Sequence, residues 1–89
     1  MNFNVDCVRN CLESNGVVFT VRSYFYNSEN SEFNDRKIKR FFIKEINKKE
    51  DLIDFVKLSG FGNVEEWWNK IEMFCKFKKK YLYLASFSH

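Results

Sequence analysis

The chain has 89 residues and no proline, a length that suits one domain and leaves no room for a second hydrophobic core. Apolar residues make up 45% of the chain and aromatic residues 19%, which excludes a protein that is disordered throughout. The formal net charge of +3 is too small to indicate a nucleic-acid-binding protein by itself, so the distribution of the charges matters more.

The first third of the chain predicts a helix followed by a strand. Apolar residues recur at helical spacing over Phe3–Ser14, and Gly16 supplies a stop signal. Val17–Tyr26 is rich in Val, Phe, Thr and Tyr, a composition typical of a strand. The next stretch, Asn27–Asn34, consists mostly of Asn, Ser and Glu, so we expect a loop there.

Two further strands enclose a pair of helices. Lys37–Asn47 predicts the second strand of the chain. Asn47 followed by Glu50 is a helix cap with an acid three residues on, and the helix that it starts is expected to run to Ser59. Lys79–Phe87 is rich in Tyr, Leu and Phe and predicts a final strand in the centre or on a well-covered part of the sheet.

The stretch Ser59–Trp68 joins the two helices and organises the chain. Gly60 or Gly62 can take the left-handed conformation that ends a helix, and Asn63 is a good N-cap for the next one. That helix is expected to end near Phe77. Its apolar stripe consists of Val64, Trp67, Trp68, Ile71, Phe74 and Cys75. Adjacent residues on a helix differ by ~100°, so one tryptophan is expected in the core and the other at its rim.

The predicted order is therefore α-β-β-α-α-β, an α+β fold that occupies residues 1–89 as a single domain.

Three stretches share their pattern with one known family. Val8–Arg22 combines a helix end, a glycine turn and a strand that holds a Thr-x-Arg pair. Leu58–Phe74 joins two helices through a Gly-Phe-Gly turn and two glutamates, and Tyr81–Phe87 is a closing strand that ends in an aromatic residue. In this order the stretches resemble the ASCH domain, a branch of the PUA-like superfamily. The resemblance implies a small PUA-like β-barrel or curved sheet flanked by helices, with an RNA-binding cleft.

The resemblance does not extend to the catalytic motif of the family. ASCH enzymes that hydrolyse a modified nucleoside carry Gly-x-Lys, and that lysine is their nucleophile or base. Here Gly16 is followed by Val17 and Val18, and the family's later glutamate has no counterpart near Val21. We therefore expect a protein that is not an enzyme, and a nucleoside-processing hydrolase is the least favoured of the functions considered.

Thr20 and Arg22 form the first candidate site. Residues two apart on a strand project from the same face, so a hydroxyl and a guanidinium would stand side by side. Such a pair suits a phosphate or the edge of a base. The alternative is a solvated strand face, or an arginine paired with a nearby glutamate.

Two clusters of basic residues are further candidates. Closely spaced cations bind backbone phosphates, and neighbouring aromatic rings can stack on bases. The first cluster consists of Arg36, Lys37, Lys39 and Arg40, for which the alternative is an edge strand that its lysines protect from aggregation. The second consists of Lys76, Lys78, Lys79 and Lys80 at a helix end, where cations also complement the helix dipole.

The cysteines predict neither disulfides nor a metal centre. Cys7 and Cys11 lie four residues apart on one helical face, but a third and fourth metal ligand are missing, and His89 is the only histidine. We expect reduced thiols, no metal and no cofactor. No leader and no apolar run of membrane-spanning length is found, so a soluble cytoplasmic protein is expected.

Two hypotheses of different classes remain. The first is an RNA-binding or other nucleic-acid-binding domain, with contacts mainly to phosphate through Thr20, Arg22 and the Arg36–Arg40 cluster. The second is a protein-interaction module or homodimer, in which the excess of Phe and Trp covers a partner. Salt separates them, because phosphate binding weakens steeply with salt and apolar association does not.

Overall fold

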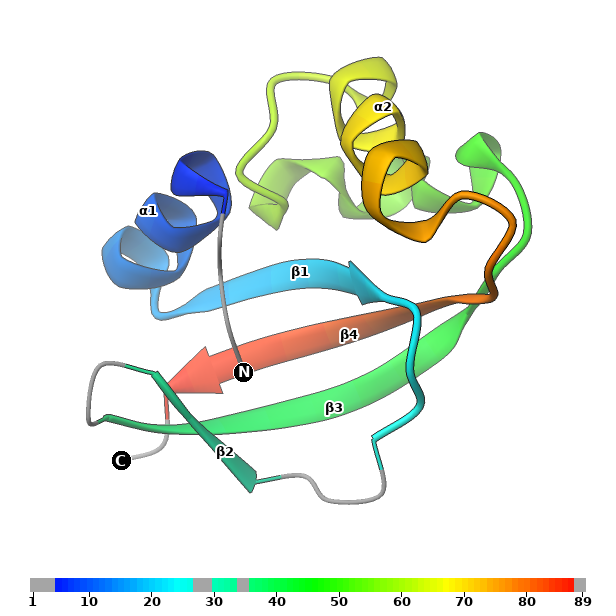
Figure 1. Ribbon diagram of the computed structural model, residues 1–89. Coiled ribbons are helices and arrows are strands. Elements are labelled where there is room, and N and C mark those ends of the chain that lie inside the picture. The colour runs from blue at the N-terminus through cyan, green and yellow to red at the C-terminus, as the bar shows by residue number, and fades with distance from the viewer. Residues whose placement is uncertain (1–4, 27–29, 34–35, 88–89) are drawn as a thin grey trace.

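Four antiparallel strands form the sheet of this α+β domain (Figure 1). The structure is a computed structural model that describes residues 5–26, 30–33 and 36–87. The strands lie in the order β1-β4-β3-β2, and every neighbouring pair is antiparallel. The prediction that the last strand lies inside the sheet is therefore confirmed. Their bounds are β1 (Val17–Arg22), β2 (Asn30–Phe33), β3 (Arg36–Ile46) and β4 (Lys80–Phe87).

The described residues form three helices beside the sheet, and local signals set two of the helix ends. They are α1 (Asp6–Asn15), the 3-10 helix η1 (Lys49–Leu58) and α2 (Val64–Cys75). Gly16, with φ +77°, ends α1 and donates its amide to the Leu12 carbonyl at 2.8 Å. Asn63 caps α2, and its side-chain oxygen accepts the Glu66 amide at 2.8 Å. Both signals were predicted.

The core consists of two clusters on opposite faces of the sheet. Side chains alternate along a strand, so Leu82 and Tyr83 point to opposite faces, which we call the Leu82 face and the Tyr83 face. On the Tyr83 face, α1 buries Val8 and Leu12 against a group of sheet residues: Val18, Ile38, Ala85 and Phe87. On the Leu82 face, η1 and α2 cover Leu82 and Ile46 with Leu52, Trp67, Ile71 and Cys75.

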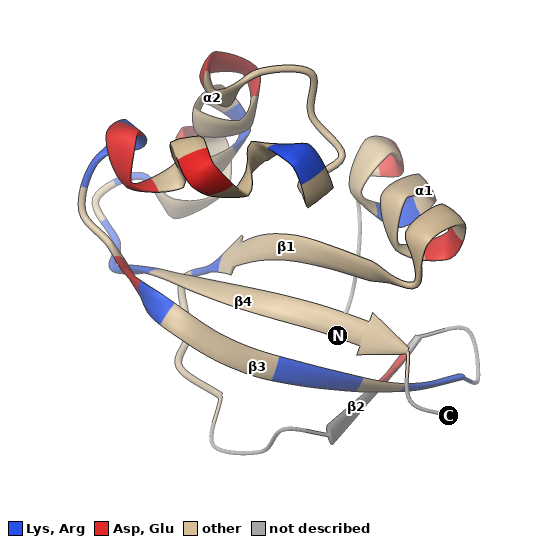
Figure 2. Cartoon of the chain, turned by 180° about the vertical axis from the view of Figure 1, so that it is seen from behind, with Lys and Arg blue, Asp and Glu red and all other residues tan. Residues whose placement is uncertain are grey.

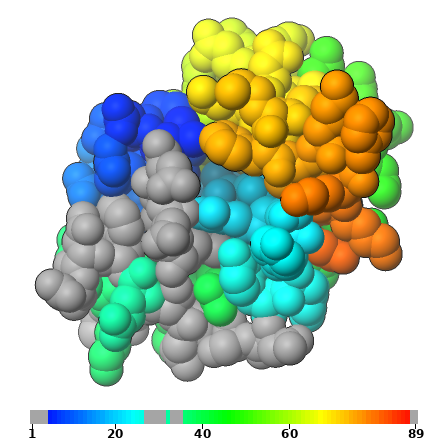
Figure 3. Space-filling model, viewed as in Figure 1, coloured from blue at the N-terminus to red at the C-terminus, as the bar shows by residue number. Residues whose placement is uncertain are grey.

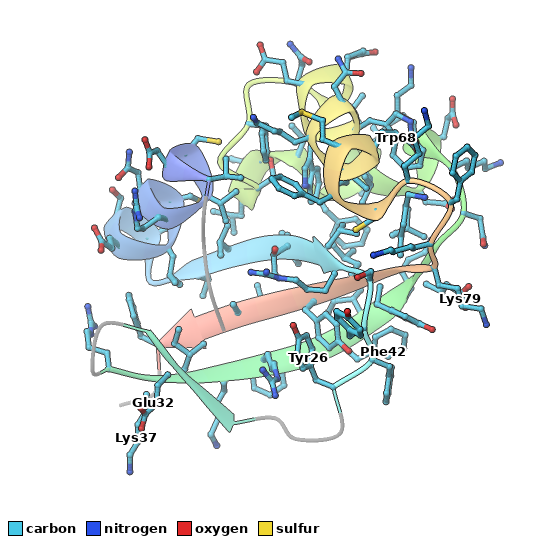
Figure 4. The ribbon with its side chains drawn as sticks, viewed as in Figure 1. Tyr26, Glu32, Lys37, Phe42, Trp68 and Lys79 are labelled. Atoms are coloured by element: carbon cyan, nitrogen blue, oxygen red, sulfur yellow. The ribbon has the colours of Figure 1, made fainter. Side chains whose placement is uncertain are left out.

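The predicted loop Asn27–Asn34 is wrong for its described part, because residues 30–33 form β2. This strand pairs with β3 and places Glu32 opposite Lys37 (Figure 4). Polar residues are tolerated at the edge of a sheet, where opposite charges across the pair also help. Residues 27–29 and 34 lie outside the described residues. Within the described part the sheet is open, with β1 and β2 at its two edges, and the first strand ends at Arg22 rather than Tyr26.

The helix before Ser59 differs from its prediction in type and in cap. It is a 3-10 helix with Lys48 at the N-cap position, one residue later than the predicted Asn47. The acid that satisfies its start is Asp51 and not Glu50: one Asp51 oxygen accepts the amides of Asn47 at 3.1 Å and of Lys48 at 3.3 Å. These bonds lower the pKa of Asp51, the Asn47 amide most, with a further contribution from the charge of Lys44.

The apolar stripe of α2 is narrower than predicted. Trp67 is only 2% exposed and Trp68 is half-buried, so the division of the two indoles between core and rim is confirmed. Phe74 is 57% exposed, and its prediction as a core residue is wrong. The buried line of α2 runs through Trp67, Ile71 and Cys75 at a spacing of four, and Phe74 is rotated ~100° away from Cys75.

Replacing Trp67 by Ala is expected to lower the free energy of unfolding by ~3–5 kcal/mol, since the cavity opens inside the core. Trp68→Ala should cost less, because that ring is already partly exposed. Met73→Ala on the same helix is the control, since Met73 is 70% exposed. Urea unfolding followed by circular dichroism measures all three, and a Trp67→Ala variant as stable as the parent would show that the core is elsewhere.

Asp51→Asn is expected to destabilise the domain in a pH-dependent way. A carboxylate whose pKa is lowered by folding stabilises the fold above its unfolded pKa, and the contribution is lost as the pH falls through the folded pKa. The difference in unfolding midpoint between parent and variant should therefore have its full size near pH ~7 and disappear below pH ~4. Asp54→Asn, at an exposed position of η1, is the control and should show no such gap.

Candidate nucleic-acid interface

The part of the Tyr83 face that α1 leaves open is crossed by the segment that follows β1. This segment, Ser23–Tyr26, is held by the hydroxyl of Tyr83, a residue that is 1% exposed. The hydroxyl accepts the Tyr26 amide at 2.7 Å and donates to the Tyr24 carbonyl at 3.4 Å. A buried phenol thus fixes the backbone of a segment whose own side chains reach the surface.

Aromatic rings gather where this segment meets the sheet. The ring of Phe42 lies edge-on to Phe25 at 5.1 Å and to Tyr83 at 5.8 Å between centroids, and Tyr26 lies 5.4 Å from Tyr83. Figure 4 shows Tyr26 and Phe42 beside the sheet. Three of the rings remain open to solvent: Tyr24 is 68%, Phe25 53% and Phe42 45% exposed. We call Tyr24, Phe25, Tyr26, Phe42 and Tyr81 the aromatic patch.

Guanidinium groups stand against aromatic rings on the same face. The Arg40 guanidinium carbon lies 3.9 Å from the centre of the Tyr26 ring, which is cation–π geometry. Arg36 makes the equivalent contact with Phe87 at 3.5 Å, four residues nearer the start of β3. The aromatic patch therefore carries a positive group at its border, at Arg40.

The sequence cluster Arg36–Arg40 is divided by the structure. Residues alternate along β3, so Arg36 and Arg40 lie on the Tyr83 face with Ile38 between them, buried. Lys37 and Lys39 are exposed on the opposite face. Figure 2 shows the Lys and Arg segments along β3 and the acidic segments on the helices. One bound strand lying on the Tyr83 face would contact the two arginines and neither lysine.

Thr20 and Arg22 do share a face, as predicted, and both line a pocket next to the aromatic patch. The pocket holds about 220 Å³ at the end of β1, between Val8 of α1 and Phe74 of α2. Figure 3 shows α1, α2 and the segment 23–26 meeting in this region. Thr20 is 7% exposed, and burial lowers the pKa of Arg22 from its ordinary value. Tyr24 and Tyr26 also line the pocket.

The second basic cluster spans the turn after α2 and the first residue of β4. Lys80 pairs with Glu72 at 3.8 Å and lies 5.6 Å from the Trp68 ring, whereas Lys76, Lys78 and Lys79 are exposed. Figure 4 shows Lys79 pointing outward at the edge of the molecule. Cations at these positions complement the dipole at the C-terminal end of α2, and one of them, Lys80, is paired with Glu72.

No disulfide joins the cysteines in the described part of the chain. Cys7 and Cys11 are half-buried and Cys75 is buried, and all three are free. Burial is the largest cause that raises the pKa of Cys7 and of Cys75. Among the described residues no group of three or more His, Cys, Asp and Glu is placed to hold a metal ion, and no described helix is long and apolar enough to cross a bilayer.

The exposed aromatic residues are the functional candidates that the sequence analysis missed. The signal was present as Tyr24-Phe25-Tyr26 directly after the first strand. It was interpreted as the end of that strand, because a run of aromatic residues is typical of a strand. In the structure this segment is held across the sheet by bonds to Tyr83, which lies 57 residues from Tyr26 in the chain.

Comparison with models of protein families, with curated protein sequences and with solved structures finds no match to this chain.

Tyr83→Phe is expected to loosen the segment 23–26. The variant keeps the ring but leaves the Tyr26 amide and the Tyr24 carbonyl without this partner, at a cost of ~1–2 kcal/mol. Amide hydrogen exchange at Tyr26 should become faster, while exchange in the middle of α2 should change only with global stability. Tyr81→Phe, which removes a hydroxyl from the neighbouring half-buried ring, is the control. Unchanged exchange at Tyr26 would contradict the assignment.

Proposed function

We propose that this domain binds single-stranded RNA through the Tyr83 face, with bases on the aromatic patch and phosphates at Arg40 and Arg22. The observation that carries the proposal is the set of exposed rings on Tyr24, Phe25 and Phe42, with the Arg40 guanidinium at its border. Proteins that bind single strands combine these two elements, since every base offers a ring face and every linkage a charge. The resemblance to the ASCH domain favours RNA over DNA and implies a PUA-like fold as part of the same proposal.

Stacking supplies more of the affinity than charge in this arrangement. A base on an aromatic side chain contributes ~1–3 kcal/mol, and three exposed rings are available. Two of the candidate cations, Arg40 and Arg22, are proposed to contact phosphates beside the patch. The nearby Lys37 and Lys39 face away from it. Log affinity for a single strand changes by ~0.7 per phosphate contact for each unit of log salt, so the salt dependence is expected to be shallow.

The proposed function is binding without catalysis. The resemblance would place a catalytic lysine after Gly16, where the chain has Val17 and Val18 at the start of β1. Thr20 and Arg22 remain to position a ligand. Neither is a general base at neutral pH, since an arginine keeps its proton in proteins.

A protein-interaction module is the second candidate, and α2 with the turn after it supports it. Met73 is 70%, Phe74 57% and Phe77 95% exposed, so three large apolar side chains point to solvent close together in sequence. Phe77 also has φ +62°, a left-handed conformation that is unfavourable for a phenylalanine. A homodimer or a protein partner covering these side chains would associate with little dependence on salt.

Anisotropy titrations of labelled single-stranded and duplex RNA, at two salt concentrations, test the first candidate. Phe42→Ala should weaken single-strand binding by about 5- to 150-fold, the equivalent of one stacked base. Arg40→Gln should weaken it and reduce the slope of log affinity against log salt by ~0.7. Lys37→Ala is the matched control, because it removes a cation from the same strand but from the opposite face.

Two outcomes would remove the proposal. One is no binding at low salt with the protein at up to ~100 µM, which lies within the range of weak non-specific affinity. The other is a loss of affinity in Lys37→Ala as large as in Arg40→Gln, which would mean that the Tyr83 face is not the contact. Sedimentation of the parent as a dimer, abolished by Phe77→Ser, would then favour the interaction module.

A further inference from the structure

The pocket at the end of β1 is a second site, of a different kind from the aromatic patch. Its volume of about 220 Å³ exceeds that of a buried cavity of ~150 Å³, which is enough to hold a benzene molecule. The space beyond one six-membered ring suits a small substituent of carboxylate size. The pocket is thus too small for a folded partner and large enough for a ligand of about ten non-hydrogen atoms.

The walls of the pocket divide into an apolar side and a polar side. The apolar side consists of Val5 at the N-cap of α1, Val8 within α1, Val21 from β1 and Phe74 from α2. The guanidinium-bearing Arg22 and two hydroxyl residues, Thr20 and Ser23, supply the polar side. Thr20, Val21, Arg22 and Ser23 are consecutive, so one short stretch of backbone carries both the cation and the hydroxyls.

We propose that this pocket binds a small organic acid, a carboxylate attached to an aromatic ring or a branched aliphatic group, with the carboxylate at Arg22 and the apolar group between α1 and Phe74. Arg22 presents a planar fork of donors that matches the two oxygens of a carboxylate. The hydroxyls of Thr20 and Ser23 can donate to the remaining lone pairs.

The position of Arg22 adds support from electrostatics. Burial lowers the pKa of Arg22, with the charge of Arg40 as a smaller contribution in the same direction, whereas Tyr26 and Cys75 act in the opposite direction. A carboxylate in the pocket lowers the free-energy cost of a charged guanidinium in this partly desolvated place. Inorganic phosphate is a poorer match, because it would bring a more strongly hydrated charge against the apolar side and fill none of it.

This inference does not depend on RNA binding. The titrations that test it contain no nucleic acid, so the two proposals can fail separately. The two proposed sites nevertheless share Tyr24, Tyr26 and Arg22, which makes both observable in one set of spectra.

A titration of the isotope-labelled full chain, followed by amide chemical shifts, tests the site with three probes: phenylacetate, phenylacetamide and inorganic phosphate. Phenylacetate should bind with a dissociation constant of roughly 1 mM, the range expected for ten non-hydrogen atoms. The largest shifts should fall in residues 20–23 and 74–75. Phenylacetamide, which has the same shape without the charge, should bind about tenfold more weakly.

Three variants locate the ligand in the pocket. Arg22→Gln should bring phenylacetate binding down to the level of phenylacetamide, and Phe74→Ala should weaken both probes at a position that is already 57% exposed. Arg36→Gln is the control, since it removes an arginine from the same face at Phe87, and it should bind as the parent does. The parent protein alone keeps the test decisive if Arg22→Gln fails to fold. Equal binding of acid and amide, binding of phosphate as tight as that of phenylacetate, or a loss in Arg36→Gln equal to that in Arg22→Gln would each overturn the proposal.

Discussion

The burial of β4 on both faces is the constraint on which the rest of the structure depends. Leu82 and Tyr83 are adjacent, point to opposite faces and are 0% and 1% exposed. The strand is hydrogen-bonded to β1 on one side and β3 on the other, and because its large apolar side chains point to both faces, both faces need cover. Two helices, η1 and α2, supply it on the Leu82 face. On the Tyr83 face α1 covers only the end of the strand near Ala85 and Phe87.

What covers the remainder of that face determines what the domain offers to a ligand. Tyr83 lies in the part of the face that α1 does not cover, and its hydroxyl cannot be left without partners at such burial. The backbone of Tyr24 and Tyr26 satisfies it, and the side chains of that segment are then directed to the surface. A requirement of the core thus places aromatic rings beside Arg40 and closes one side of the pocket around Arg22. Stability and the candidate sites therefore depend on the same phenol.

Features set by neighbouring residues could be predicted from the sequence, and features set by distant contacts could not. Gly16 and Asn63 act within one turn of helix, and both were located correctly. The division between Trp67 and Trp68 follows from helical geometry alone. By contrast, three of the four residues of β2 are polar, and their pairing with β3 at a sheet edge gives no alternating apolar signal in the sequence. The PUA-like fold implied by the resemblance stays a prediction.

One part of the predicted site, the basic cluster, is not brought together on one face of the sheet. Arg36–Arg40 is one cluster in sequence, but alternation along a strand divides it between two faces. The argument that Thr20 and Arg22 share a face uses the same period of two, and it succeeded because those residues are two apart. Applied to the basic cluster, this period separates Lys37 and Lys39 from Arg40. Asp51, which caps η1 in place of Glu50, was missed because the helix starts one residue later than Asn47 indicated.

The shared segment links the two proposed ligands physically. Under the two proposals, an acid in the pocket would contact Tyr24 and Tyr26, and RNA on the aromatic patch would contact the same residues. The Arg40 guanidinium also lies over the Tyr26 ring.

Any change that one ligand makes in the affinity of the other must be reciprocal, because the coupling free energy belongs to the pair. Its sign depends on the segment: a ligand that orders 23–26 lowers the entropic cost of binding for the second. Arg22 adds an opposing contribution, since a carboxylate that neutralises it reduces the positive charge available to phosphates beside Arg40. The bonds from Tyr83 already order the segment, so the loss of positive charge would be the larger effect, and under the two proposals an acid in the pocket would weaken the binding of RNA to the patch.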